Sequence, residues 1–184
     1  MSDTTVSNSM RRMAARLAAV QALYDIEMTT HDAAYVIASF TARGGTAELE
    51  GEKIAADPQL MADIVRGVAA DGATLDGLIT GAGKSKRDVG RYDALLRAIL
   101  RAGAFELSKH PQFDAALLIS QYLTITDSFF ERTEVGLVNA LLDAMAKSLR
   151  PDADLPHAAP HADPHADPHA DPLETPIGDG PAEG

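Results

Sequence analysis

The arginines near the start of the chain are the residues whose type and spacing could do chemistry. Arg11, Arg12 and Arg16 open a segment of helical apolar spacing, and Arg12 and Arg16 lie one turn apart on a shared face. Guanidinium groups on a helix can clamp phosphates and stack on nucleic-acid bases. The pattern predicts an amphipathic helix with one face in the core and a cationic face toward a polyanion. The alternative is an ordinary solvated helix face.

The chain as a whole is acidic, although this local patch is basic. The 184 residues include 16 Lys and Arg against 27 Asp and Glu, a formal net charge of −11. This sign argues against nonspecific nucleic-acid binding through bulk charge. Eight of the acids follow Pro151, where there is no Lys or Arg, which leaves 19 acids against all 16 bases in the first 150 residues. A nearly balanced body can still carry a local basic face.

A second basic cluster lies near the middle of the chain and comprises Lys84, Lys86, Arg87 and Arg91. It is either an additional contact for RNA or a partner, or a solvated loop. The glycine-containing run 81–85 superficially resembles a phosphate-binding loop. It lacks the required spacing of the first glycine and has no apolar strand before it, so that interpretation is rejected.

Several classes of protein are disfavoured by what the sequence lacks. It has no cysteine, so disulfides, thiolate nucleophiles and thiolate metal sites are excluded. The first nine residues do not have the pattern of a secretory signal, and no apolar run reaches the roughly 18 residues of a membrane helix. No nucleophile–base–acid set and no metal-ligand spacing stands out before the tail. We therefore expect a soluble, cytoplasmic protein without membrane partners, which is not an enzyme and needs no cofactor.

The spacing of apolar residues is helical nearly everywhere, which predicts an all-α fold of about seven helices. Thr30 is the expected N-cap of the second helix, and a polar loop is expected from Gly45 to Ala56. The sequence Asp57-Pro58 is a typical helix start. The apolar stripes that predict the seven helices lie within 10–24, 36–40, 60–68, 75–79, 92–107, 118–129 and 138–149.

The chain divides into three parts by composition. Residues 1–9 are predicted to be a flexible N-terminus, residues 10–150 a helical domain, and residues 151–184 a disordered acidic tail rich in His, Pro and Asp. The tail histidines are spaced by four and could take up a transition metal. Without fixed geometry a solvated low-complexity tail is the better interpretation, so no metal site is predicted.

Three segments in order along the chain resemble one known family. They are Ala15–Tyr24 (ARLAAVQALY), Leu100–Leu107 (LRAGAFEL) and Leu137–Asp143 (LVNALLD). Each is similar to the corresponding element of the NusB family of bacterial transcription antitermination factors, including that family's "LRxAxxEL" and "FVNGVLD" elements. The resemblance covers roughly Arg11 to Pro151.

The resemblance implies an all-helical domain of two small packed bundles. It also implies binding of boxA-type RNA together with the small-subunit ribosomal protein NusE. The expected role is antitermination within the transcription elongation complex, notably during ribosomal RNA transcription. By position, it implies that the RNA-binding residues are Arg11, Arg12, Arg16, Gln21, Tyr24 and Asn139.

Some of the matching residues have structural alternatives. Gln21 and Tyr24 can instead pack the helix, and Asn139 can be structural rather than RNA-binding. Arg101 and Glu106 also match the family, but a partly buried Arg or Glu needs a hydrogen-bond partner. We therefore expect both to hold the bundle together.

The chain departs from the family pattern at Gly103, where the family has alanine, and at positions that bear on binding. Gly136 and Leu137 stand where the family has a basic residue and an aromatic one, and Leu137 cannot stack on a base. Gln121 stands where the family has an acid. These departures keep a second hypothesis open, in which the chain is a divergent NusB-like protein-interaction module with weak or lost RNA binding.

Overall fold

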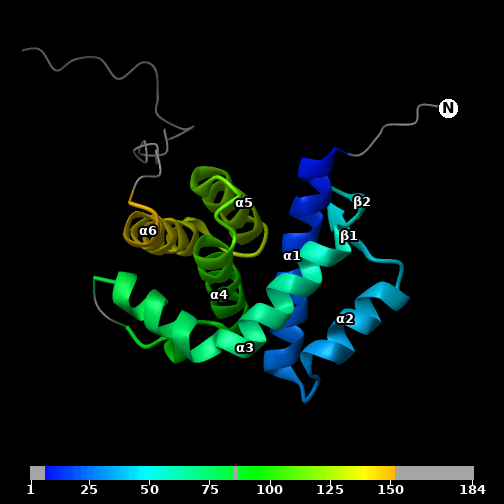
Figure 1. Cartoon of the computed structure of the whole chain (residues 1–184), viewed down its shortest axis with the longest axis horizontal. Helices are drawn as coiled ribbons and strands as arrows, with labels where there is room; N and C mark the ends of the chain where they lie inside the picture. The colour runs from blue at the N-terminus through cyan, green and yellow to red at the C-terminus, as the bar shows by residue number, and fades with distance from the viewer. Residues whose placement is uncertain (1–6, 85–86, 152–184) are drawn as a thin grey trace, which may run out of the picture.

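The fold was determined as a computed structural model that describes residues 7–84 and 87–151 (Figure 1). The described residues form six α-helices, one short 3₁₀ helix and one β-hairpin, so the predicted all-α class is confirmed. The bounds are α1 Asn8–Met28, α2 Ala33–Ala42, β1 Thr46–Leu49, β2 Glu52–Ala55, α3 Pro58–Ala82, η1 Val89–Arg91, α4 Ala94–Lys109, α5 Ala115–Asp127 and α6 Arg132–Leu149. The predicted flexible N-terminus, residue Lys86 and the predicted tail from 152 onward fall largely or wholly outside the described residues.

Aspartate side chains cap four of the helices. Asp57 Oδ1 accepts hydrogen bonds from the backbone N–H groups of Gln59 and Leu60 at 3.1 and 3.2 Å, which confirms the predicted start of α3. The predicted cap of α2 at Thr30 is wrong, because Asp32 occupies that position and accepts from the N–H of Tyr35 at 2.8 Å. A carboxylate also interacts favourably with the positive end of the helix dipole, which a hydroxyl does not.

The segment predicted as a polar loop contains the antiparallel hairpin of β1 and β2. Its two-residue turn is Glu50-Gly51, and both residues have positive φ, 53° and 82°, as the turns favoured in tight hairpins require. Ala47 and Ile54 are partners in register and are both buried. Each strand thus buries one residue, and so short an alternation is not distinguishable from a loop in the sequence.

Helix α3 contains the two helices that were predicted on either side of Asp71-Gly72. The break is present as a kink, since Asp71 has non-helical φ and ψ of −106° and 15°. One residue out of helical geometry bends the axis of α3 without ending the helix, which continues to Ala82 (Figure 1). The six helices therefore account for the seven predicted stripes.

Helix α1 lies at the centre of the first bundle, where it contacts α2, α3, α4 and both strands (Figure 1). All seven residues from Ala14 to Val20 are buried, so the middle of α1 has no solvent face. The predicted amphipathic helix with a cationic face is therefore wrong for these turns. Four of the seven are alanines, whose small side chains let neighbouring helices approach α1 on every side.

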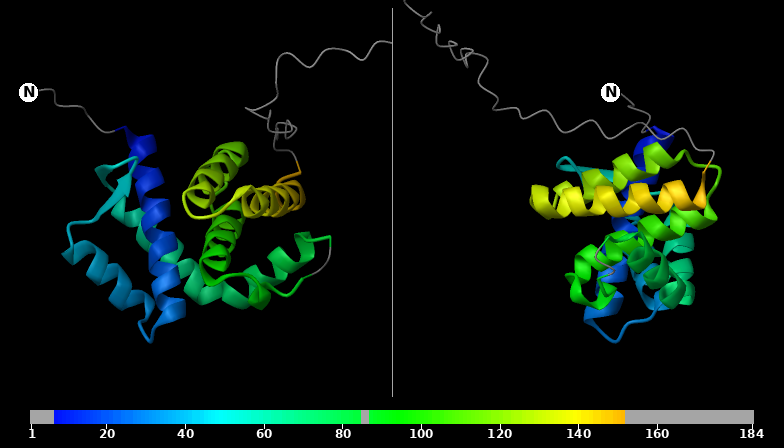
Figure 2. Two further views of the ribbon diagram at one scale, coloured as in Figure 1. Left: turned by 180° about the vertical axis from the view of Figure 1, so that it is seen from behind. Right: turned by 90° about the vertical axis from the view of Figure 1, so that its left-hand side faces the viewer.

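Helix α4 joins this bundle to the second one, which contains α4, α5 and α6. Figure 2 shows α5 and α6 side by side, and α4 contacts both of them as well as α1 and α3. The predicted buried stripe of α4 is confirmed: Leu96, Ile99, Leu100, Gly103 and Leu107 are all buried. No helix among the described residues is long and apolar enough to cross a bilayer.

Candidate nucleic-acid interface

Two of the predicted arginines reach the surface in the first turns of α1. Arg12 is exposed and Arg11 is half-buried. The Arg12 guanidinium carbon lies 5.1 Å from the centre of the Phe113 ring, within the range of a cation–π interaction. In the part of the chain that the structure describes, no residue accepts a hydrogen bond from either side chain. Their N–H donors therefore remain available for an external anion.

The structure corrects the prediction that Arg16 contacts RNA. Arg16 is only 1% exposed and forms a bidentate ion pair with Glu106, with Nε–Oε2 and Nη2–Oε1 distances of 2.6 and 2.8 Å. Its Nη1 donates to Gln121 Oε1 at 2.6 Å. A guanidinium saturated inside the core cannot reach a phosphate without breaking these bonds. Arg16 is thus a structural residue.

Glu106 is the buried centre of a hydrogen-bonded set, which we call the Glu106 network: Arg16, Asp63, Glu106, His110, Gln121 and Tyr122. The Tyr122 hydroxyl donates to Glu106 Oε2 at 2.8 Å. Burial alone raises the pKa of Glu106, but hydrogen bonds from His110, Arg16 and Tyr122 outweigh it and lower the pKa. The pKa of Tyr122 is raised well above its usual value, mainly by burial and secondly by the negative charge of Glu106. Glu106 is therefore an ionised acceptor that joins α1, α4 and α5, as its predicted structural role requires.

Arg101 also has the structural role that the sequence predicted. Its Nε and Nη2 donate to the two carboxylate oxygens of Asp76 at 2.7 and 2.8 Å, and its Nη1 lies 3.6 Å from Glu27 Oε2. The hydrogen bond to Asp76 is the main cause of its raised pKa. Arg101 therefore ties α4 to α3 and to the end of α1.

His110 extends the Glu106 network to the surface of α3. Its Nδ1 lies 3.3 Å from Glu106 Oε1, and its Nε2 lies 2.6 Å from Oδ2 of the exposed Asp63. The hydrogen bond with Glu106 raises the pKa of His110, burial opposes the rise, and Asp63 adds to it. The imidazolium form is thus favoured in the folded protein.

We expect His110 to make stability depend on pH. Because its pKa is raised on folding, its contribution is complete below the ordinary value of 6.5 and is lost as pH rises through the folded pKa. Urea unfolding of the native protein and of His110→Gln at a series of pH values should give a stability difference that shrinks as pH rises. Asp63→Asn, which removes the negative charge beside Nε2, should reproduce part of this effect. A stability difference that stays constant across the pH series would contradict the raised pKa of His110 in the folded protein.

Phe113 is a residue of this surface that the sequence did not single out. It lies between α4 and α5, and the guanidinium carbons of Arg12 and Arg16 each lie 5.1 Å from its ring centre. Its ring also makes an edge contact with His110, with centroids 5.7 Å apart. Phe113 thus separates the exposed arginine from the buried one. The only signal in the sequence is an aromatic residue just after the helix end at His110-Pro111.

Arg150 is a second residue that the sequence identified only as a helix end. Its side chain donates to four backbone carbonyls, those of Glu106, Leu107, His110 and Phe113, at 2.6 to 3.0 Å. It therefore fixes the loop that carries Phe113 to the end of α6. No feature of the local sequence marks such long-range acceptors.

The remaining predicted RNA-binding residues are spread over the molecule. Gln21 and Tyr24 are exposed on α1, Tyr24 by 38%. Asn139 is half-buried on α6, which Figure 1 shows on the far side of α4 from α1. The structure thus brings Arg11 and Arg12 together at one end of α1 and does not place Asn139 beside them. The predicted roles of Gln21, Tyr24 and Asn139 remain predictions.

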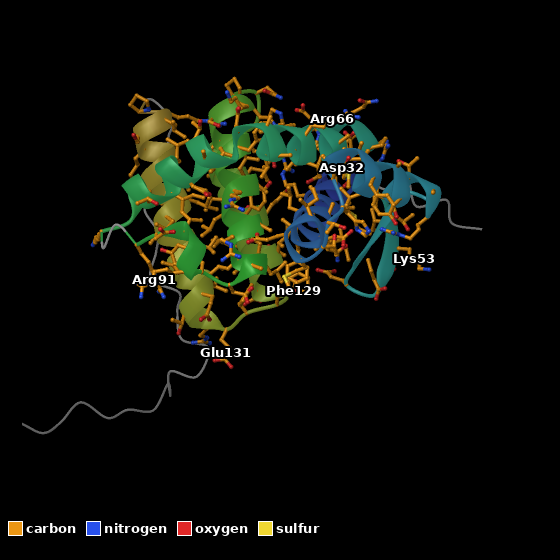
Figure 3. All side chains as sticks on the ribbon, turned by 90° about the horizontal axis from the view of Figure 1, so that it is seen from below. Asp32, Lys53, Arg66, Arg91, Phe129 and Glu131 are labelled. Carbon is orange, nitrogen blue, oxygen red and sulfur yellow. The ribbon has the colours of Figure 1, made fainter. Side chains whose placement is uncertain are left out.

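Between α1, the hairpin turn and the end of α5 lies a groove of about 780 Å³, which we call the acidic groove. Figure 3 shows Phe129, one of its lining residues, close to α1 seen nearly end-on. Gln21 of α1 and Gln121 of α5 also line it, so it borders the Glu106 network. Across residues 7–84 and 87–151, no three His, Asp or Glu side chains lie where they could share a metal ion.

The described structure is that of a helical protein of two bundles, and comparison with known proteins identifies its family. Residues 13–147 match the sequence profile of the NusB family, and the chain belongs to that family. A protein of Nitrobacter hamburgensis called "Transcription antitermination protein NusB" is 43% identical over 141 residues, covering 76% of this chain and 88% of the relative. A Sinorhizobium fredii protein of the same name is 41% identical over 150 residues, covering 81% and 94%.

A solved structure supports the fold assignment. The T. maritima NusB structure aligns with a TM-score of 0.59 at 20% sequence identity, covering 74% of this chain and 90% of that one. The family resemblance and the predicted two-bundle fold are thereby confirmed.

Proposed function

We propose that this protein is a transcription antitermination factor that binds boxA-type RNA together with the ribosomal protein NusE. In this role it acts on the transcription elongation complex and supports synthesis of ribosomal RNA. Family membership and the names of its relatives support the antitermination role. The observation that carries RNA binding is the pair of surface arginines, Arg11 and Arg12, beside Phe113.

The arginine pair is suited to a single-stranded nucleic acid. The two side chains leave their donors toward solvent, and the first turns of α1 add the positive end of a helix dipole. Phe113 holds the Arg12 guanidinium plane in place by a cation–π contact, and a base can stack on the other face of that plane. Phosphate contacts from the arginines and stacking nearby are the usual elements of single-strand recognition.

The double variant Arg11→Ala/Arg12→Ala is expected to bind boxA RNA more weakly in the presence of NusE. Each lost phosphate contact retains counterions on the RNA, so the slope of log affinity against log salt should become shallower by about 1.4 for two contacts. Fluorescence anisotropy of labelled RNA across a salt series measures both quantities. Arg16 is left intact because its removal would disturb folding as well as binding.

A matched control is the double variant Arg66→Ala/Arg132→Ala. Both arginines are exposed, and they lie on α3 and at the start of α6. Figure 3 shows Arg66 on the outer side of α3. This control removes the same charge from other surfaces and should retain the native salt slope. Equal loss in both double variants would mean that only total charge matters, and the proposed interface would be wrong.

A second candidate is a NusB-like protein-interaction module with weak RNA binding. The observations that favour it are the burial of Arg16 and the presence of Leu137, half-buried on α6, where the family has an aromatic residue. RNA binding that is undetectable with the native protein, while NusE still binds, would support this candidate.

A further inference from the structure

The acidic groove combines an apolar floor with an acidic rim. Its apolar lining consists of Met10, Met13, Leu17, Leu49, Ile125 and Phe129. Two of these remain unusually open for large apolar side chains: Met10 is 41% exposed and Phe129 is 45% exposed. Apolar surface left open inside a concave site is typical of a binding surface rather than of scattered surface residues.

The charge of the groove has a single sign. Glu48, Glu50 and Glu52 line it, and its lining contains no Lys, Arg or His. The nearest cation in the hairpin is Lys53, which lies opposite Glu48 in register without forming an ion pair with it and is not part of the lining. All three carboxylates are exposed, and no cationic side chain in the described part of the chain forms an ion pair with them. An RNA backbone would be repelled here, whereas a lysine or arginine would be attracted.

The backbone of the hairpin fixes these carboxylates in place. The Glu50-Gly51 turn closes a two-residue hairpin, and Ala47 and Ile54 anchor its strands in the core. The rim is therefore held by a rigid turn across from the end of α5, which contributes Phe129 beyond its last residue. A groove whose two walls are pre-ordered binds a partner at a lower entropic cost.

We propose that the acidic groove docks a short segment of a protein partner in which basic residues alternate with apolar ones. The apolar side chains occupy the floor between α1 and α5, and the basic side chains pair with Glu48, Glu50 and Glu52. The existence of a protein partner comes from the proposed function, on which this inference rests. The inference adds that the partner binds in the acidic groove. RNA and protein thus bind different parts of α1: RNA at Arg11 and Arg12, and the protein segment along Met10, Met13 and Leu17. Gln21 also lines the groove, so this proposal assigns it to the protein partner instead of to RNA.

The test uses the full chain and a short fluorescein-labelled peptide in which lysine and leucine alternate. Its control peptide carries glutamate at every lysine position. We expect the cationic peptide to bind and the acidic one not to bind. The variant Glu48→Gln/Glu52→Gln should weaken binding of the cationic peptide on the order of tenfold, since two attractive charges are removed at an otherwise unchanged surface.

Two further variants separate the groove from charge in general. Glu131→Gln/Glu134→Gln removes two carboxylates at the start of α6 that do not line the groove, and this variant should bind the peptide as the native chain does. Phe129→Ser should weaken binding while the rim charge is intact, because it removes apolar surface from the groove. Equal effects of the two double variants, or no effect of Phe129→Ser, would overturn the proposal.

RNA binding distinguishes failure of this inference from failure of the proposed function. Glu48→Gln/Glu52→Gln should retain the boxA RNA affinity of the native chain, and unlabelled RNA should not displace the peptide. Displacement of the peptide by RNA would assign the groove to RNA and overturn the inference. Loss of peptide binding in the groove variants, with no RNA binding by the native chain, would instead uphold the groove and refute the RNA role.

Discussion

Replacing Arg16 by alanine is expected to destabilise the protein by about 3–5 kcal/mol, the usual cost of removing one partner of a buried ion pair. The Glu106 carboxylate is fully buried and accepts from Arg16 through both of its oxygens. Without Arg16 its charge loses its main cationic partner, and the remaining donors, Tyr122 and His110, cannot occupy the vacated positions. Gln121 would also lose its donor.

Chemical unfolding in urea, followed by circular dichroism, measures this loss. Arg12→Ala on the same helix is the matched control and should change stability by less than about 1 kcal/mol, since its partner is a single surface cation–π contact. Arg16→Lys should also be strongly destabilising, because an ammonium cannot make the bidentate contact with Glu106. Native-like stability of either Arg16 variant would refute the role assigned to the buried pair.

Replacing Gly67 by alanine is expected to destabilise the packing of α3 on α4. An added Cβ at Gly67 would overlap the edge of the buried Phe105 ring. The ring is confined by the core and cannot swing aside without displacing its neighbours, so the overpacking should cost about 1–3 kcal/mol. This loss should exceed the gain of up to about 1 kcal/mol that alanine normally brings to a helix interior.

A glycine on the same helix provides the control. An added Cβ at Gly77 would meet no atom within 4 Å, so Gly77→Ala should stabilise the protein by about 0.5–1 kcal/mol. Thermal unfolding of the two variants should therefore shift the midpoint in opposite directions. A stabilising effect of Gly67→Ala would show that α3 and α4 are less tightly packed than the structure indicates.

Local signals in the sequence predicted most of the helices because those signals act within one or two turns. The start at Asp57-Pro58 and the buried stripe of α4 depend on nearby residues only, and both are present in the structure. The hairpin was missed because its pairing buries only Ala47 and Ile54. The hairpin is stabilised by packing against α1, and a local sequence pattern cannot predict that contact.

The candidate site was predictable only where it depends on neighbouring residues in the sequence. An arginine-rich start of α1 is visible in the sequence, but which arginine faces solvent depends on the partners that surround the helix. Glu106 lies 90 residues from Arg16, and Phe113 lies about a hundred positions from Arg12. Neither contact can therefore be predicted from the spacing of nearby residues. The acidic groove likewise joins the hairpin turn to the end of α5.

By itself the sequence determined the helical class, the main helix boundaries, the family and the concentration of arginines at the start of α1. Only the tertiary structure decided that Arg16 is buried and that Arg11 and Arg12 remain free to bind. The physical reason is that a guanidinium is stable in a core only where a carboxylate and further acceptors meet it. Glu106 and Gln121 reach Arg16 from two other helices, and Arg12, one turn earlier, has no such acceptors among the described residues.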